Sequence, residues 1–217
     1  MFDDREIEAL TEVIHSGWVT QGSKVAAFEK AVATYTGTRF AIATTSWSTS
    51  MFLAMHLQGI GAGHEIIVPS FTCPAVPNAI RQTGAMPAWV DIDRRTFTLD
   101  PDLIEAAITP RTKGIMAIHY YGLAADMDAI NKVARRHDLL VFEDAAVALG
   151  GSYKGRKIGN LGAPTGFSFH ARKIVTTGEG GMLTTDDEYL AERMCTLRSH
   201  GASVTDFVRH QAKGTIL

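Results

Sequence analysis

Two short segments place basic and acidic side chains where an enzyme could use them. Lys173 comes four residues after an apolar run that ends at Phe169, and Glu143 and Asp144 close another such run. Carboxylates at a buried strand end need a cationic partner. An amine beside a carboxylate suits Schiff-base chemistry, since the lysine needs a lowered pKa to be nucleophilic and a pyridinium ring needs a fixed anion. Taken singly, the lysine is better explained as an ordinary loop charge and the carboxylates as a helix cap or a solvated strand end, so only their combination indicates chemistry.

Alternating helices and strands must position these residues. Amphipathic helical patterns cover residues 7–14 and 25–35, and short apolar runs then alternate with helical segments. This alternation predicts an α/β fold, with a mostly parallel sheet and helices on both faces. The predicted strands are 40–43, 65–68, 86–90, 114–118, 139–142, 165–169 and 181–185, and the later helices are 48–58, 75–82, 101–107, 126–136 and 187–198.

The carboxyl ends of the strands are the expected site. Ligands of open α/β sheets bind there, so the residues that directly follow each strand are the first candidates. These are 44–49, 69–73, 119–121, 144–147 and 168–173.

Several segments in unbroken order resemble one known family, the DegT/DnrJ/EryC1/StrS family of pyridoxal-phosphate (PLP) dependent sugar aminotransferases. The segments are 69–72, 90–93, 107–113, 126–130, 143–146 and 168–181, and the similarity runs from about Asp3 to Gly201. It implies the PLP-dependent transferase fold of the aspartate-aminotransferase type (fold type I). Against that pattern, residues 1–217 look like the PLP-binding large domain, truncated at its C-terminal end and without the small C-terminal domain.

The resemblance implies a role for each matching residue. Lys173 would bind PLP as an imine and later shuttle a proton, and Asp144 would face the pyridine nitrogen and keep it protonated. Ser48, Thr49 and Ser168 would hold the phosphate, in agreement with the anion preference of helix N-termini.

Two cofactor-binding positions depart from the family pattern. Cys73 stands where many members have an aromatic residue that stacks on the pyridine ring, and Val147 stands where Gln or His usually binds the phenolic oxygen. Losing one neutral hydrogen bond would weaken cofactor binding by about 1 kcal/mol without abolishing a covalent link.

Four residues are candidates for substrate contacts. Trp18 and Thr20 lie in a stretch similar to the loop at the mouth of the family's sugar site, although an aromatic residue in a loop also often covers a core. His119 and Tyr121 follow a predicted strand and could meet sugar hydroxyls. Equally, backbone carbonyls could satisfy both side chains.

Composition excludes several classes of function. A net charge of -2 leaves no basic excess for nucleic acid, and the apolar runs are too short to span a membrane. No secretory segment opens the chain, which favours the cytoplasm. Cys73 and Cys195 have no metal-ligand spacing, so neither a zinc site nor a disulfide framework is expected.

The leading hypothesis is therefore an aminotransferase that moves an amino group from an amino acid, glutamate by resemblance, to a nucleotide-linked keto-sugar, working as a homodimer. A truncated PLP-binding or interaction remnant with little turnover is an alternative. A PLP-dependent sugar dehydratase is a second, but those enzymes carry histidine where Lys173 stands. A nicotinamide dehydrogenase is disfavoured because no GxGxxG follows the strand at 41–43.

Overall fold

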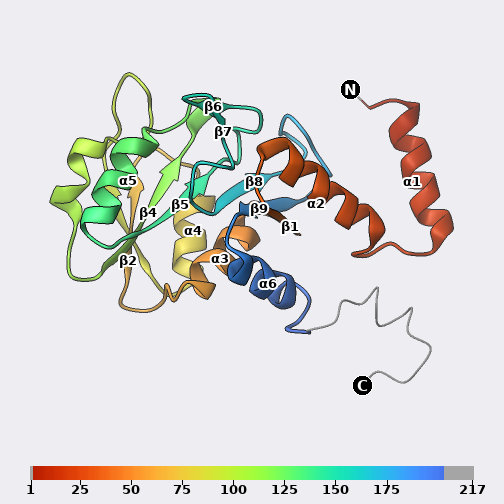
Figure 1. Cartoon of the computed structure of the whole chain (residues 1–217), viewed down its shortest axis with the longest axis horizontal. Helices are drawn as coiled ribbons and strands as arrows, with labels where there is room; N and C mark the ends of the chain where they lie inside the picture. The colour runs from red at the N-terminus through yellow and green to blue at the C-terminus, as the bar shows by residue number, and fades with distance from the viewer. Residues whose placement is uncertain (1, 203–217) are drawn as a thin grey trace.

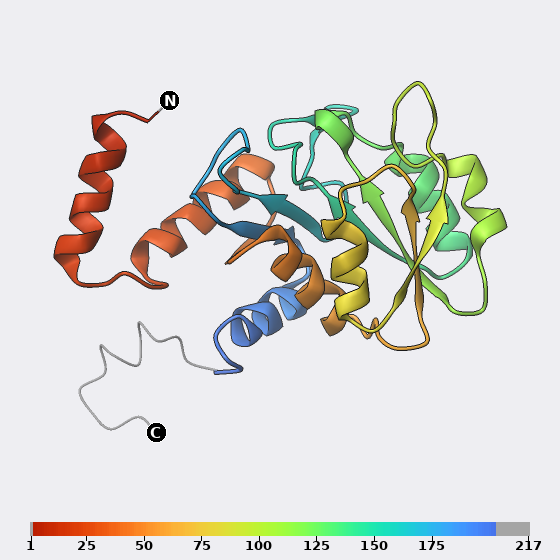
Figure 2. The same ribbon diagram turned by 180° about the vertical axis from the view of Figure 1, so that it is seen from behind.

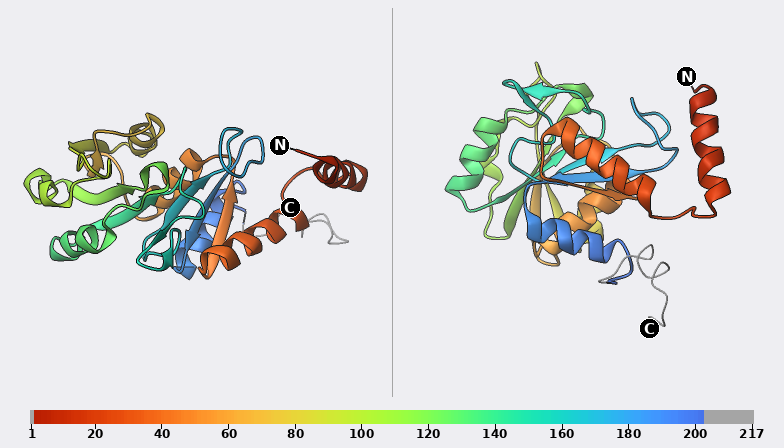
Figure 3. Two further views of the ribbon diagram at one scale, coloured as in Figure 1. Left: turned by 90° about the horizontal axis from the view of Figure 1, so that it is seen from above. Right: turned by 45° about the vertical axis from the view of Figure 1, so that its right-hand side comes forward.

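The computed structural model describes residues 2–202, and two helices open the chain (Figure 1). Helix α1 (Asp4–Ser16) begins at a capping box, in which the side chains of Asp3 and Glu6 accept from backbone N–H groups of the first turn, and ends at Gly17 in the left-handed conformation. Helix α2 (Ser23–Thr36) ends in the same way at Gly37. Helix α1 buries no residue and lies apart from the sheet in every view (Figure 3).

The centre of the molecule is a seven-stranded sheet in the order β1-β9-β8-β5-β4-β2-β3. All neighbouring strands are parallel except β9, which runs antiparallel to both β1 and β8. The strands are β1 (Phe40–Thr44), β2 (Glu65–Pro69), β3 (Met86–Val90), β4 (Thr112–Ile118), β5 (Leu140–Asp144), β8 (Thr165–Ser168) and β9 (Gly181–Thr185). A separate hairpin contains β6 (Ser152–Tyr153) and β7 (Arg156–Lys157). The expectation of a mostly parallel sheet is confirmed.

Helices cover both faces of the sheet, as expected for buried parallel strands. One face packs against α3 (Trp47–Leu57), α4 (Ala75–Gln82) and α6 (Glu188–Leu197), and the other against α2 and α5 (Met127–Arg136). Helix α5 lies in front of the sheet in Figure 1, and α4 lies in front in the reverse view (Figure 2). Along β4, Met116 and Ile118 join the α3–α4 core while Ala117 joins the α5 core. This alternation decides which strand-end side chains can reach a common site.

The prediction of one continuous helix at 101–107 is confirmed only in part. This stretch instead forms two short 3-10 turns, Pro101–Leu103 and Glu105–Ala107, on either side of the buried Ile104. A helix of seven residues that begins with proline forms few α-helical hydrogen bonds, and these do not offset the entropic cost of helix nucleation. The backbone conformation here is therefore decided by the packing of the Ile104 side chain. A third 3-10 turn, η3 (Tyr120–Gly122), follows β4 after the single residue His119.

Candidate active site at the carboxyl edge of the sheet

A cavity of about 420 Å³ opens where the parallel strands end. It lies between the ends of β4, β5 and β8, the start of α3 and the segment before α4. The structure brings seven of the candidate residues to its wall, namely Ser48, Cys73, Tyr121, Asp144, Val147, Ser168 and Lys173. Residues that are up to 125 positions apart in the sequence thus line one space.

Asp144 is the buried acid of this cavity, with only 6% of its surface exposed. Burial raises its pKa to about 6, against the opposing effect of the Ala146 N–H, which donates to Oδ1 at 2.9 Å, and of the positive charge of Lys173. The buried position of Asp144 therefore disfavours the ionised form of its carboxyl group. A cation that enters the cavity beside it would relieve that cost.

Lys173 reaches the same cavity from the loop between β8 and β9. Its N–H donates to the His170 carbonyl at 2.9 Å, and the N–H of Thr177 closes the loop onto the Phe169 carbonyl at 3.0 Å. Because Asp144 pairs with Gly166 across neighbouring parallel strands, the acid and the lysine come from adjacent strand ends. The lysine side chain is half-buried.

The N-terminus of α3 forms another wall of the cavity. Ser46 is the N-cap, and its Oγ accepts from the Thr49 N–H at 3.2 Å. Ser46, Trp47 and Ser48 line the cavity, and the first-turn N–H groups with the helix dipole favour an anion there. Thr49 does not line the cavity, because its N–H is capped and its hydroxyl lies 3.0 Å from that of Thr45. The backbone N–H of Thr49 is thus bound by the Ser46 cap, and the structure does not bring Thr49 to the cavity as a phosphate contact.

Glycine is required where β9 starts beside this helix. A Cβ on Gly181 would lie 2.1 Å from the Ser46 carbonyl carbon and 2.4 Å from the Trp47 nitrogen, and one on Gly180 would lie 2.3 Å from the Thr177 hydroxyl. The close approach of β9 to the helix N-terminus therefore exists only because Gly181 lacks a side chain, whereas Gly180 makes room for the Thr177 side chain.

Gly181→Ala is expected to destabilise the chain by about 1–3 kcal/mol, because the helix N-terminus must move away from β9. Urea unfolding would measure the change. Gly61→Ala is a suitable control, since Gly61 has no positive φ and a methyl group there would meet only the Thr83 carbonyl oxygen at 3.8 Å, an ordinary van der Waals distance. A Gly181 variant no less stable than the Gly61 variant would contradict the close approach.

His119 is fully buried and lies on the other face of the sheet, which corrects the expectation of a substrate contact. Its Nε2 lies 2.8 Å from Glu143 Oε2, and its Nδ1 accepts from the Ala125 N–H at 3.1 Å. A neutral imidazole that accepts at Nδ1 carries its proton on Nε2, so His119 donates to Glu143. Side chains alternate along strands, so the registered pair Ala117 and Glu143 shares the face of His119, opposite to Asp144. Both ring nitrogens are occupied within the chain.

Trp18 and Thr20 are not brought to the cavity. They lie between α1 and α2, where the Trp18 indole N–H donates to the Gln21 carbonyl at 2.8 Å. In the described part of the chain, these two expected substrate residues are therefore separate from Lys173 and Asp144.

Several residues of the cavity wall received no role of their own from the sequence, although all but Glu179 lie in the strand-end segments 44–49, 119–121 and 168–173. They are Ser46, Tyr120, His170, Arg172 and Glu179. Tyr120 could have been found from the alternation of β4, because it continues the face of Met116 and Ile118. Arg172 and His170 lie in a loop whose path has no such period.

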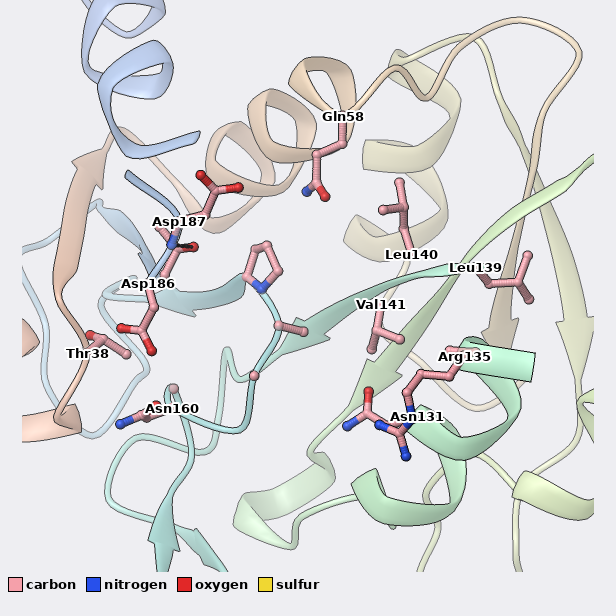
Figure 4. A pocket seen from close by; sticks show the side chains of 16 residues that line it. Thr38, Gln58, Asn131, Arg135, Leu139, Leu140, Val141, Asn160, Asp186 and Asp187 are labelled. Carbon is pink, nitrogen blue, oxygen red and sulfur yellow. Dashed lines mark hydrogen bonds between the residues drawn. The ribbon is translucent and has the colours of Figure 1, made fainter. Parts of the chain in front are cut away.

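A second cavity of about 350 Å³ lies at the opposite edge of the sheet, between the starts of β5 and β8 and the end of β9 (Figure 4). The two acidic side chains in its wall, Asp186 and Asp187, stabilise the local backbone through hydrogen bonds. Asp187 caps α6 by accepting from the Leu190 N–H, and Asp186 accepts from the Arg39 N–H at 2.7 Å. Of these two cavities, therefore, only the one at the carboxyl edge brings an amine and a buried carboxylate together.

Within residues 2–202, no cluster of three or more His, Cys, Asp or Glu side chains is placed to hold a metal ion. In the same part of the chain, no helix has both the length and the apolar character needed to cross a membrane.

The cavity at the carboxyl edge of this mostly parallel sheet combines a lysine, a buried acid and a helix N-terminus that favours anions. A cofactor with an aldehyde, a ring nitrogen and a phosphate requires these three groups. This class of protein is the fold type I group of PLP-dependent transferases. Within that class, the chain belongs to the DegT/DnrJ/EryC1/StrS aminotransferase family, whose sequence profile matches residues 1–216. The expected family and fold are confirmed.

Similar proteins act in sugar biosynthesis. The chain is 46% identical to the spore coat polysaccharide biosynthesis protein SpsC of Bacillus subtilis over 97% of its length, and 50% identical to GDP-perosamine synthase of Caulobacter vibrioides over 92%. It spans 54% of each of these relatives, about half their length.

Solved structures show the same fold. DesV of S. venezuelae, crystallised with a ketimine intermediate, is 40% identical with a TM-score of 0.91, and the match covers 98% of this chain and 57% of DesV. A sugar aminotransferase of Streptococcus pneumoniae in its PLP form is 33% identical with a TM-score of 0.87, covering 91% and 56% of the two chains. The expectation of PLP as the cofactor is thus confirmed at the level of the family.

Proposed function

We propose that this chain provides the PLP-binding part of a nucleotide-sugar aminotransferase. The observation that carries the proposal is that Lys173, in the loop after β8, and the buried Asp144, at the end of the adjacent strand β5, line one cavity. The residues fit the cofactor's three functional groups. Lys173 would bind the aldehyde, and Asp144 would contact the ring nitrogen. The start of α3, together with Ser48 and Ser168, would bind the phosphate.

Each residue then has a defined task. When bound, PLP supplies the electron sink for reactions at the amino carbon. Asp144 holds a proton on the ring nitrogen by charge attraction in a buried position. Lys173 Nζ anchors the cofactor and, once the donor amine has displaced it, takes and returns the proton at the substrate carbon. The α3 N–H groups, Ser48 Oγ and Ser168 Oγ orient the phosphate.

The finer assignments rest on the relatives. A GDP-perosamine synthase and a structure of DesI with its TDP-sugar product support a nucleotide-linked keto-sugar as the amino acceptor. We also propose that glutamate is the amino donor, that the protein forms a homodimer and that it works in the cytoplasm. Two exposed apolar side chains, Tyr121 in the cavity wall and Ile174 next to Lys173 in the sequence, would be covered by a second copy.

A PLP-binding protein with little turnover is the second candidate. Two wall residues favour it, because the Cys73 thiol offers no ring face and Val147 offers no hydrogen bond to a cofactor. A turnover assay with glutamate and a nucleotide keto-sugar separates the two candidates.

Borohydride reduction after addition of PLP is expected to attach the pyridoxyl group to Lys173, since this is the lysine of the cavity wall. Peptide mass mapping would locate the label. Lys154 and Lys157, in the β6–β7 hairpin region away from the cavity, are internal controls for non-specific imines. A label on either of them, with Lys173 unmodified, would refute the assignment.

A further inference from the structure

Tyr120 occupies a place in the cavity that neither the sequence motifs nor the proposed roles account for. It lines the same wall as Cys73 and Asp144 and continues the α3–α4 face of β4, where it packs against the core cluster that contains Ile118 and Val76. Both Cys73 and Asp144 act electrostatically on its phenol, which places the ring near the thiol and the acid. Burial raises the pKa of Tyr120, so the phenol stays neutral at pH 7.

The Tyr120 ring is held in position by other aromatic rings. The Phe71 centroid lies 4.7 Å away at an interplanar angle of 43°, and the Tyr121 centroid lies 4.5 Å away at 89°. The backbone is held as well, because Leu123 N–H donates to the Tyr120 carbonyl at 3.0 Å. A side chain fixed in this way loses little conformational freedom when a ligand binds.

The other aromatic side chains of the cavity are engaged elsewhere or lie at its rim. The Trp47 indole is buried below β8, where a Cβ on Gly166 would lie 2.8 Å from its Nε1. His170 Nε2 lies 3.6 Å from Glu179, and Tyr121 is 79% exposed. Tyr120 alone among these four combines partial burial with a position next to Asp144.

We propose that Tyr120 provides the aromatic face on which the pyridine ring of the cofactor stacks, beside the wall formed by Cys73 and Asp144. The inference rests on the proposed function, since it concerns the ring whose nitrogen Asp144 holds. A flat, electron-poor ring bound next to a carboxylate gains from an aromatic face at van der Waals distance. The small Cys73 side chain leaves room for that contact.

Cofactor affinity tests this role. PLP is titrated into the purified chain and its variants, and both imine absorbance and the induced circular dichroism of the bound cofactor are recorded. Tyr120→Leu is expected to raise the Kd about threefold to tenfold and to change the induced dichroism, because the stacking contact is lost. Tyr120→Phe keeps the ring and should stay within about twofold of the parent. Tyr189→Leu makes the same change at an exposed site on α6 and should leave the Kd unaltered.

The outcomes separate this inference from the proposed function. A parent chain that forms no imine at Lys173 would refute the proposed function and this inference with it. An imine in the parent with the same Kd and dichroism in Tyr120→Leu would overturn the role of Tyr120 alone. Thermal unfolding without cofactor identifies a variant that fails to fold, and Tyr120→Met then serves as the second ringless variant. Restored affinity in Tyr120→Leu/Cys73→Phe would support a ring face at this wall.

Discussion

Replacing Asp144 by asparagine is expected to remove most aminotransfer activity while making the cofactor-free chain more stable at neutral pH. A neutral amide cannot hold the ring proton of PLP, and the loss of one preorganised electrostatic contact lowers kcat about a hundredfold or more. The fold should persist, because an asparagine Oδ1 can still accept from the Ala146 N–H.

The gain in stability follows from the pKa of the acid. Burial raises the pKa of Asp144 from its ordinary 3.8 to about 6, so between these values the folded chain binds more protons than the unfolded chain. The free energy of unfolding therefore falls as pH rises through this window, by about 3 kcal/mol in total. Asp144→Asn removes that decline, since the amide does not titrate.

Two measurements check the Asp144 prediction. Urea unfolding of the parent and variant without cofactor, from about pH 4 to about pH 8, should show their stability difference growing toward neutral pH. A half-reaction with glutamate should show the loss of turnover. Asp102→Asn, a change at an exposed carboxylate, is the control and should alter neither. Full transamination by Asp144→Asn would refute the electrostatic role.

His119→Leu is expected to lower the free energy of unfolding by about 3–5 kcal/mol, because it leaves the Glu143 carboxylate buried without its ring donor. The Ala163 N–H, at 3.3 Å from Oε1, would be its remaining partner. Chemical denaturation at neutral pH measures the loss. Replacing both partners, as in His119→Leu/Glu143→Leu, should recover part of it, since no buried charge remains.

An exposed ion pair of the same length serves as a surface control. Lys24 and Glu12 are also 2.8 Å apart, but their side chains are 59% and 66% exposed. Lys24→Leu is therefore expected to change stability by less than about 1 kcal/mol. Equal losses in the His119 and Lys24 variants would show that the buried pair adds little.

The sequence by itself determined the class of fold and placed Lys173 and Asp144 among the candidate site residues. The alternation of apolar runs and helical segments predicts a parallel sheet, because strands covered on both faces must be apolar throughout. The rule that ligands bind at the carboxyl ends then selects the residues after each strand, Lys173 and Asp144 among them. These inferences need only local patterns and one general property of such sheets, so no knowledge of packing is required.

Tertiary structure decided which of the neighbouring side chains face the cavity. Three consecutive residues differ completely in their surroundings. His119 is buried and hydrogen-bonded to Glu143, Tyr120 packs in the cavity wall beside Asp144, and Tyr121 is exposed at the cavity rim. The backbone N–H of Thr49 donates to the Ser46 cap, and the Trp18 indole N–H donates to the Gln21 carbonyl. Such outcomes depend on strand register, on the hydrogen bonds that each buried group must satisfy, and on contacts between residues far apart in the chain, none of which a local pattern contains.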